Sequence, residues 1–327
     1  MTNADKKIFT VSLIGCGRIG FGYDYKQKVK YPLSHFSNFL NSEHFVLKAI
    51  AEPDVKTRKI IKEEFNLNTY SDYKELLKNE TTDIVCIASP DATHETLLLD
   101  VLNYDPLLVF CEKPLSLNFD GVQNVVKLYE RKKIPLMVNY SRRFIDEFQT
   151  LKRWIDSGEL GKIQTVTIYY SRGFVHNATH YLDIILWYFG FPEKILVESQ
   201  RKGLYDGDPT ISFILMYESG IEIRFMGIDT SDLIINEMDI VGDNGRVKID
   251  TDGFMSKYKV NTHPVYTDYK SFVLENTMQM QFNKVLNNAA CNIFEYLAYQ
   301  KPLLSPASNS IDIFRLSEKI KTTGWPN

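Results

Sequence analysis

Residues 8–20 read IFTVSLIGCGRIG and join a largely apolar run to three closely spaced glycines. The apolar part, residues 9–14, is typical of a strand buried on both faces of a sheet. The glycines that follow fit the pattern G-x-G-x-x-G. In that pattern the first glycine permits a tight turn, the second lets a pyrophosphate approach the backbone, and the third lets a helix pack on the strand. We therefore expect Gly15, Gly17 and Gly20 to bind a dinucleotide, the alternative being a plain structural turn.

The first 140 residues alternate short apolar runs with amphipathic stretches, as a parallel sheet with helices on both faces requires. The expected strands are residues 9–14, 45–51, 84–88, 107–111 and 136–138, and the expected helices include 33–40, 55–65, 93–102 and 119–131. This alternation predicts a doubly wound α/β fold for residues 1–140.

Residues 141–327 show a different pattern. A helix is expected at 147–157, followed by runs of alternating polarity with short turn signals between several of them. The expected strands are 163–170, 195–200, 211–217, 221–228, 233–241 and 246–249, and the closing helices are near 277–299 and 308–321. These features predict a C-terminal α+β domain with a large, mostly antiparallel open sheet.

The composition excludes several classes of protein. The 327 residues carry a net charge of −3, so we expect neither a nucleic-acid nor a membrane partner. No apolar run approaches the roughly 20 residues of a membrane span, and the N-terminus lacks an apolar signal segment, which favours the cytoplasm. The four cysteines form no C-x-x-C pair, so buried free thiols are expected rather than a disulfide or a zinc site.

The end of the second expected strand bears on the choice of cofactor. Glu52 stands there and can accept hydrogen bonds from the adenosine ribose, while repelling a 2′-phosphate. This favours NAD over NADP, although Arg18 is placed to meet a phosphate. Residues 21–32 insert a segment before the next helix, which is either a surface loop or a source of contacts to cofactor or substrate.

Polar side chains follow two further strands of the expected sheet. Ser89 and Pro90 follow the strand 84–88, and Glu112 and Lys113 follow the strand 107–111. Ligands of such sheets lie outside the carboxyl ends of the strands. We therefore expect Lys113 to donate to a substrate hydroxyl, the alternative being an exposed charged pair.

The stretch 171–190, SRGFVHNATHYLDIILWYFG, carries a third cluster. On a helix, His176, His180, Asp183 and Trp187 fall on one face. Packed or surface side chains, a metal site, and proton transfer or substrate binding are the alternatives. We rank metal lowest because no H-E-x-x-H pattern or cysteine pair supports it.

Together these motifs resemble the Gfo/Idh/MocA oxidoreductases, and the likeness extends over nearly the whole chain. The matching segments are Gly15-Cys16-Gly17-Arg18-Ile19-Gly20, Ser89-Pro90 with His94, Glu112-Lys113-Pro114, Tyr140-Ser141-Arg142-Arg143-Phe144, residues 158–163, His180 with Asp183, and residues 241–245. One position departs from the family pattern, because His176 stands where many members carry an aspartate.

The resemblance implies a Rossmann domain, a nicotinamide cofactor, and a sugar or polyol substrate, with association into a homodimer or homotetramer. Lys113 resembles the active-site lysine of the family and His180 its catalytic acid/base. Asp183, His176 and Arg143 are the implied substrate residues. The implied cofactor residues are Gly15, Gly17, Arg18, Ile19, Gly20, Glu52, Ser89, Pro90, His94, Glu112 and Lys113.

The expected function is hydride transfer between NAD(P) and a sugar, a polyol or a sugar derivative such as a nucleotide sugar. Two alternatives stay open: a redox-assisted enzyme that is not a dehydrogenase and holds NAD tightly, and a non-catalytic NAD-binding regulator. Net release of NADH with a sugar separates the dehydrogenase from both.

Overall fold

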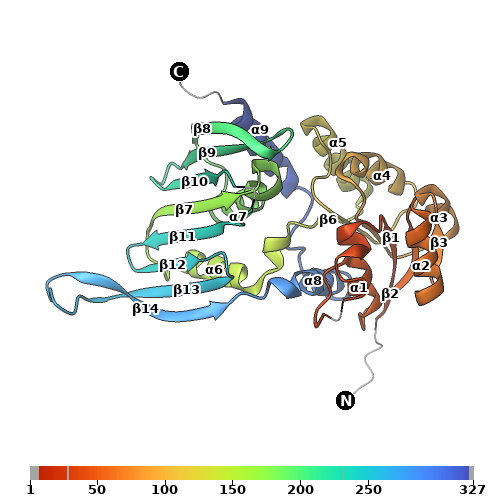
Figure 1. Cartoon of the computed structure of the whole chain (residues 1–327), viewed down its shortest axis with the longest axis horizontal. Coiled ribbons are helices and arrows are strands. Elements are labelled where there is room, and N and C mark those ends of the chain that lie inside the picture. Colours follow the sequence, from red (N-terminus) through yellow and green to blue (C-terminus); the bar gives the residue numbers. More distant parts are fainter. Residues whose placement is uncertain (1–6, 28, 231, 324–327) are drawn as a thin grey trace, which may run out of the picture. The chain divides into compact units, whose positions relative to one another are not determined.

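The chain is described here by a computed structural model that covers residues 7–27, 29–230 and 232–323. It divides into two compact units, each built on its own sheet (Figure 1). The first unit comprises Met1–Phe144 with Asn283–Ile311, and the second comprises Ile145–Phe282 with Asp312–Asn327. Residues 283–311 thus return to the first unit, a feature that the contiguous division into 1–140 and 141–327 does not contain.

The first unit holds a six-stranded sheet in which every pairing is parallel. Its order is β3 (Asn68–Tyr70), β2 (Phe45–Ala51), β1 (Phe9–Ile14), β4 (Ile84–Ile87), β5 (Leu108–Cys111) and β6 (Leu136–Val138). The strand order reverses between β1 and β4. The predicted doubly wound sheet is confirmed, and its switch point lies where such sheets bind ligands.

Helices from both ends of the first unit's sequence complete one core. The helices are α1 (His35–Leu40), α2 (Val55–Phe65), α3 (Tyr73–Asn79), α4 (His94–Val101), α5 (Phe119–Lys132) and α8 (Val285–Tyr299). Phe39 of α1 and Ile293 of α8 are fully buried in the same hydrophobic cluster as Val11 and Leu13 of β1. Burial of this apolar surface, at roughly 25 cal/mol per Å², fixes the returning helix to the unit.

The second unit holds an eight-stranded sheet in which only the β7–β10 pairing is parallel among those described. The order is β14 (Lys270–Gln279), β13 (Phe254–Thr262), β12 (Gly245–Ile249), β11 (Asn236–Gly242), β7 (Ile163–Ser171), β10 (Glu222–Ile228), β9 (Asp208–Met216) and β8 (Lys194–Tyr205). The predicted large, mostly antiparallel sheet is confirmed.

One face of this sheet is apolar, since alternate residues such as Val166, Ile168 and Tyr170 of β7 are fully buried. The helical segments of the second unit include α6 (Asp146–Asp156), the short turn η4 (Phe174–Ala178) and α7 (Thr179–Phe189). The residues of α9 (Asn309–Thr322) belong partly to each unit. Phe174 of η4 packs edge to face on Phe213 of β9, which anchors this turn to the sheet.

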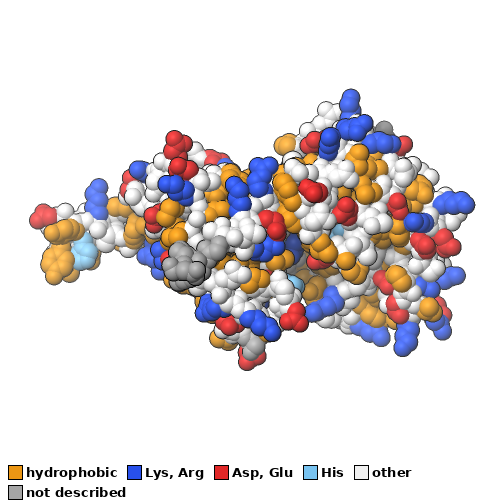
Figure 2. Space-filling view, turned by 90° about the horizontal axis from the view of Figure 1, so that it is seen from above, with side chains coloured by type: hydrophobic (Ala, Val, Ile, Leu, Met, Phe, Trp, Pro, Cys, Tyr) orange, Lys and Arg blue, Asp and Glu red, His pale blue; other side chains and the backbone are white. Residues whose placement is uncertain are grey.

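The hairpin β13–β14 corrects the sequence analysis, which placed no strand between 250 and 276. The helix expected from residue 277 is wrong over its first residues, because Thr277 to Gln279 belong to β14. Most of β14 is exposed, so the hairpin lacks the alternating burial that reveals a strand. Hydrophobic side chains gather at its projecting end (Figure 2), where Val265, Tyr266 and Tyr269 are exposed.

In the part of the chain that the structure describes, no helix has both the length and the apolar character needed to span a bilayer. Cys16, Cys86 and Cys111 are buried free thiols, as predicted, whereas Cys291 is exposed.

Candidate functional site

The glycine loop lies at the switch point of the parallel sheet, and its three glycines have different surroundings. Gly15 adopts φ +92°, and a Cβ there would lie 2.6 Å from the Ser89 nitrogen at the end of β4. A Cβ on Gly20 would lie 2.2 Å from the carbonyl oxygen of Gly15. Gly17 is exposed and has nothing within 4 Å of its Cβ position. Gly15 and Gly20 are therefore needed for packing, and Gly17 leaves the backbone accessible to a large ligand.

The segment after the loop is a five-residue helical turn, η1 (Arg18–Gly22), in which the Gly22 N–H donates to the Gly17 carbonyl over 2.9 Å. Ile19 is half-buried on this turn, and the exposed Arg18 guanidinium lies 5.0 Å from the centre of the Tyr23 ring. A long helix does not follow the glycines, because residues 23–34 intervene before α1.

Asp24 organises this inserted segment. Its buried carboxylate accepts hydrogen bonds from the main-chain N–H of Leu33 at 2.7 Å and from the hydroxyls of Ser34 and Ser37. These donors lower the pKa of the Asp24 carboxyl, although burial opposes the shift. The insertion is therefore fixed to the start of α1 by one carboxylate.

Glu52, directly after β2, lies against the glycine loop. Its Oε2 accepts from the main-chain N–H of Cys16 at 2.7 Å, and its Oε1 accepts from that of Asp54 at 2.9 Å. The carboxylate is half-buried. A negative charge is thus held beside the loop in the position from which ribose hydroxyls can be bound.

The end of β4 is held by a buried histidine. The His94 ring contacts the carbonyl oxygen of Ser89 through Nε2 at 2.9 Å and that of Pro114 through Nδ1 at 2.6 Å. Both acceptors are main-chain groups, and a neutral ring donates to one of them at a time. His94 therefore ties the exposed Pro90 loop to the Lys113–Pro114 peptide, which is cis.

Glu112, at the end of β5, is the centre of a hydrogen-bonded group that also contains His35 and Asn139. Its Oε1 accepts from His35 Nε2 at 2.8 Å and from Asn139 Nδ2 at 2.7 Å. His35 is 1% exposed and begins α1, while Asn139 follows β6. Three segments of the first unit thus meet at the residue before Lys113.

Burial alone would raise the pKa of the Glu112 carboxyl. The hydrogen bond and charge of His35, the Asn139 amide and the charge of Lys113 together outweigh it and hold that pKa below its usual range. Glu112 is consequently ionised at neutral pH and places a fixed negative charge beside Lys113, which is half-buried.

Arg143 lies on the short turn η3 (Ser141–Phe144) and is 5% exposed. Its Nη1 donates to the carbonyl oxygen of Leu304 at 3.0 Å. Within the first unit this hydrogen bond fixes the returning segment near residue 304.

In the second unit, the α-helix begins at Thr179, so the expected common face applies to His180, Asp183 and Trp187. His176 belongs to the wider turn η4, which changes the angular spacing between it and α7. His180 is half-buried and Asp183 is fully buried.

His176 pairs with Asp208, a residue that the sequence analysis missed. Its Nδ1 lies 2.7 Å from Asp208 Oδ2, and the main-chain N–H groups of Val175 and His176 donate to the same carboxylate at 2.6 and 3.0 Å. The His176 ring stacks on Tyr205 with centroids 4.4 Å apart, and Arg172 donates to the Tyr205 hydroxyl at 2.8 Å.

One of the two missed residues, Asp208, has a signal in the sequence, and the other, His35, has none. Asp206-Gly207 is a strong two-residue hairpin signal, and Tyr205 pairs with Asp208 across it. Recognising that hairpin would have placed Asp208 at the start of a strand. His35 follows Ser34, whose side chain caps α1, but nothing local predicts its contact with Glu112, 77 residues away.

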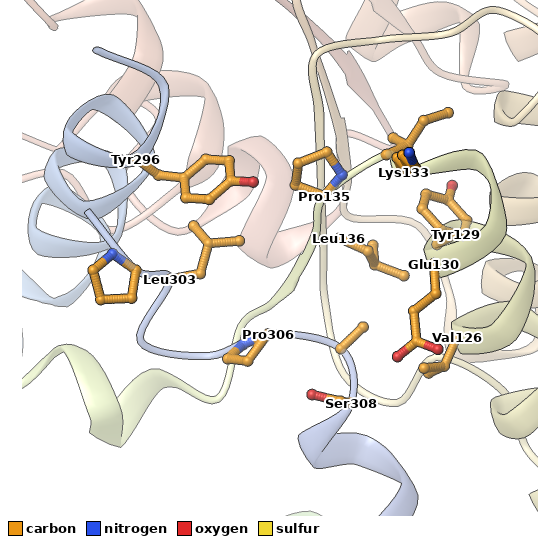
Figure 3. Close-up of a pocket in the computed structure, with 13 residues that line it drawn as sticks. Val126, Tyr129, Glu130, Lys133, Pro135, Leu136, Tyr296, Leu303, Pro306 and Ser308 are labelled. Carbon is orange, nitrogen blue, oxygen red and sulfur yellow. The ribbon is translucent and has the colours of Figure 1, made fainter. Parts of the chain in front are cut away.

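A cavity of about 560 Å³ lies elsewhere in the first unit (Figure 3). Tyr129 and Glu130 of α5 line one side, and Tyr296, Leu303 and Pro306 line the other. Leu136, the first residue of β6, also lines it, so the cavity lies at the opposite end of this strand from Asn139. It is distinct from the glycine-loop edge.

Comparisons with known proteins agree with this arrangement. Residues 9–140 match the family model GFO_IDH_MocA, described as an oxidoreductase family with an NAD-binding Rossmann fold. Among curated proteins, the oxidoreductase YrbE of Bacillus subtilis is 28% identical over 157 residues, 48% of this chain and 42% of that protein. The chain thus spans less than half the length of this relative.

Inositol 2-dehydrogenase of Burkholderia vietnamiensis is 24% identical over 267 residues, 73% of each chain. A crystal structure of an Agrobacterium radiobacter oxidoreductase in complex with NAD⁺, L-tartaric acid and magnesium shares the fold, with a TM-score of 0.76 and 16% identity. It covers 96% of this chain and 95% of that one. Residues 9–140 are thus similar to an oxidoreductase family with an NAD-binding Rossmann fold, and the whole chain shares its fold with a solved oxidoreductase.

Proposed function

We propose that the chain is a dehydrogenase that transfers a hydride between NAD and a carbinol carbon of a sugar, polyol or sugar derivative, including nucleotide sugars. The open position of Gly17 between two tightly packed glycines carries this proposal. A Cβ there would fill the space in which a pyrophosphate approaches the backbone, so the loop fits a dinucleotide. Relatives that bear the name inositol 2-dehydrogenase support the substrate class.

NAD is preferred to NADP in this proposal because of Glu52. Its carboxylate is held by the loop's own main chain and presents negative charge where NADP would carry its 2′-phosphate. Arg18 is the cation with which a 2′-phosphate would pair, and its stacking on Tyr23 leaves it on the exposed side of the turn.

When bound, the nicotinamide supplies the hydride acceptor. Lys113 donates a hydrogen bond to the substrate oxygen and stabilises the negative charge that develops there. His180 removes the hydroxyl proton as general base, a role worth roughly 10²–10⁴-fold in rate. Glu112, ionised and bound to His35, keeps Lys113 beside a fixed counter-charge.

The other three residues expected to bind substrate, Asp183, His176 and Arg143, differ in how exposed their side chains are. His176 is exposed and available to a ligand, whereas Asp183 and Arg143 are buried. We propose that His176 contacts substrate directly and that Arg143 acts through the segment it binds at Leu304. We further propose that copies of the chain associate into a dimer or tetramer through the second unit, whose projecting hairpin exposes aromatic side chains.

The test combines binding with turnover. The purified chain is titrated with NAD and NADP by calorimetry, then assayed for NADH formation with myo-inositol, D-glucose, D-glucuronate and UDP-N-acetylglucosamine. We expect NAD to bind more tightly, and Lys113→Ala and His180→Ala each to reduce turnover about a hundredfold while NAD still binds. Lys59→Ala, on the exposed face of α2, is the matched control and should keep full turnover. Failure to bind either dinucleotide, or near-normal turnover in both variants, would overturn the proposal.

A further inference from the structure

The carboxylate of Asp208 is buried and is surrounded by hydrogen-bond donors from a neighbouring turn. Asp208 is 4% exposed, and its carboxylate accepts three hydrogen bonds within 3.0 Å from the segment 175–176. Gly173, at φ +94°, lets that segment wrap the carboxylate, because a Cβ there would lie 2.1 Å from Asp208 Oδ2. The neighbouring Arg172 also has a positive φ, 63°, which is uncommon outside glycine.

These contacts hold the imidazole ring of His176 in one orientation. An ionised carboxylate only accepts hydrogen bonds, so the proton of a neutral His176 ring must lie on Nδ1. Its Nε2 then carries a lone pair. The side chain is 57% exposed, and stacking on Tyr205 limits rotation of the ring.

We propose that Asp208 is a positioning residue that fixes the tautomer of His176, so that Nε2 forms a subsite accepting a hydrogen bond from a hydroxyl group of the ligand. The class of ligand is a polyhydroxylated compound, which offers an O–H donor at this point. A carbonyl or ether oxygen at the same place meets a lone pair and is disfavoured. The identity of the ligand rests on the proposed function, whereas the tautomer does not.

Arg172 and Tyr205 support the subsite rather than form it. The guanidinium donates to the Tyr205 hydroxyl and so holds the ring on which the imidazole lies. The site therefore needs residues from the turn η4 and from the β8–β9 hairpin, which no single sequence motif contains.

The first test reads the tautomer directly. The full chain has six histidines, so ¹⁵N labelling of histidine gives a spectrum that can be assigned, with His176→Gln identifying the signals of His176. In alkaline buffer, where imidazole is neutral, we expect His176 to show the Nδ1–H tautomer. Finding the Nε2–H form would overturn the proposal, and the tautomer itself is read from the wild-type chain.

Asp208→Asn is the second test. It keeps the shape of the side chain but replaces the charged carboxylate with a neutral amide that has a single acceptor oxygen. The population of the Nδ1–H form should therefore fall. Asp206→Asn is the matched control: its carboxylate is fully exposed in the same hairpin, and Asn-Gly makes an equally good turn. An Asp208→Asn protein with an unchanged tautomer would overturn the proposal.

The third test concerns the ligand, with myo-inositol as the probe. We expect saturating myo-inositol to shift the Nε2 resonance of the wild type and of Asp206→Asn, but not of Asp208→Asn. With NAD present, Asp208→Asn should raise KM about tenfold and change kcat less. A missing Nε2 shift in the wild type contradicts the subsite. A chain that shows the shift but forms no NADH keeps the inference and rejects the proposed dehydrogenase.

Discussion

The two polar regions of this chain use histidine and carboxylate pairs in opposite ways. At the end of β5, Glu112 and His35 are both largely enclosed, with side-chain exposures of 14% and 1%. Beside α7, Asp208 is enclosed to a similar degree, at 5%, but its partner His176 is 57% exposed. The first pair therefore joins segments of the scaffold, and the second presents a ring to whatever lies outside.

The free energy of unfolding lost when one member of such a pair is removed therefore depends on how deeply both members are buried. Removing one member of an enclosed pair leaves a desolvated charge, which costs several kcal/mol when nothing replaces the partner. Removing an exposed member lets water take its place. Substitutions at the two regions should consequently separate effects on folding from effects on binding.

The largest expected effect is at the glycine loop, which lies in the first unit together with the enclosed pair. Gly20→Ala places a Cβ 2.2 Å from the Gly15 carbonyl oxygen and should lower the free energy of unfolding by about 3 kcal/mol. Gly17→Ala has open space and an ordinary φ of −67°, so its free energy of unfolding should change by less than about 0.5 kcal/mol while NAD affinity falls. Urea unfolding and calorimetric titration measure the two quantities. Equal stability of Gly20→Ala and wild type would contradict the packing role of Gly20.

The next effect is the response of the Glu112 group to acid. Because the pKa of Glu112 is lower in the folded chain, its contribution to stability is complete above the unfolded pKa of about 4.3 and is lost as the pH falls through the folded value. Glu112→Gln should cost about 1–3 kcal/mol at neutral pH, and this difference should narrow below about pH 4.3. Urea midpoints measured between pH 7 and pH 3 test it.

Glu63→Gln is the matched control for that series, since Glu63 is 63% exposed on α2 and pairs only loosely with Lys59 at 3.8 Å. It should follow the wild type within about 0.5 kcal/mol throughout. A Glu112→Gln difference that stays constant with pH would contradict the role assigned to the ionised carboxylate.

The parts of the fold that the sequence predicted are those with local sequence signals. The parallel sheet and the positions of Gly15, Glu52 and Lys113 follow from local signals, because strand ends and glycine patterns are encoded within a few residues of each other. The antiparallel sheet was predicted where one face is buried, as in β7, and missed where both faces are exposed, as in β14.

The hydrogen-bond partners of the buried side chains could not be predicted from the sequence, because they are far apart along the chain. His35 and Glu112 are separated by 77 positions, and His176 and Asp208 by 32. No periodicity links such residues, and only the folded register brings them together. His176 lies on η4, a wider turn than α7, so the 3.6-residue spacing used to predict the common face applies only from Thr179 onward.

The smallest expected effect belongs to the exposed member of the second pair. His176→Gln removes a ring that is already more than half in water, and Asp208 keeps its main-chain donors at Val175 and His176. The free energy of unfolding should therefore fall by only about 0.5 kcal/mol, while binding of a hydroxylated ligand weakens. Urea unfolding of His176→Gln and Glu112→Gln under the same conditions compares their losses in free energy of unfolding. If both variants lost the same stability, exposure of the partner would not govern the cost, and His176 would have to be regarded as scaffold like His35.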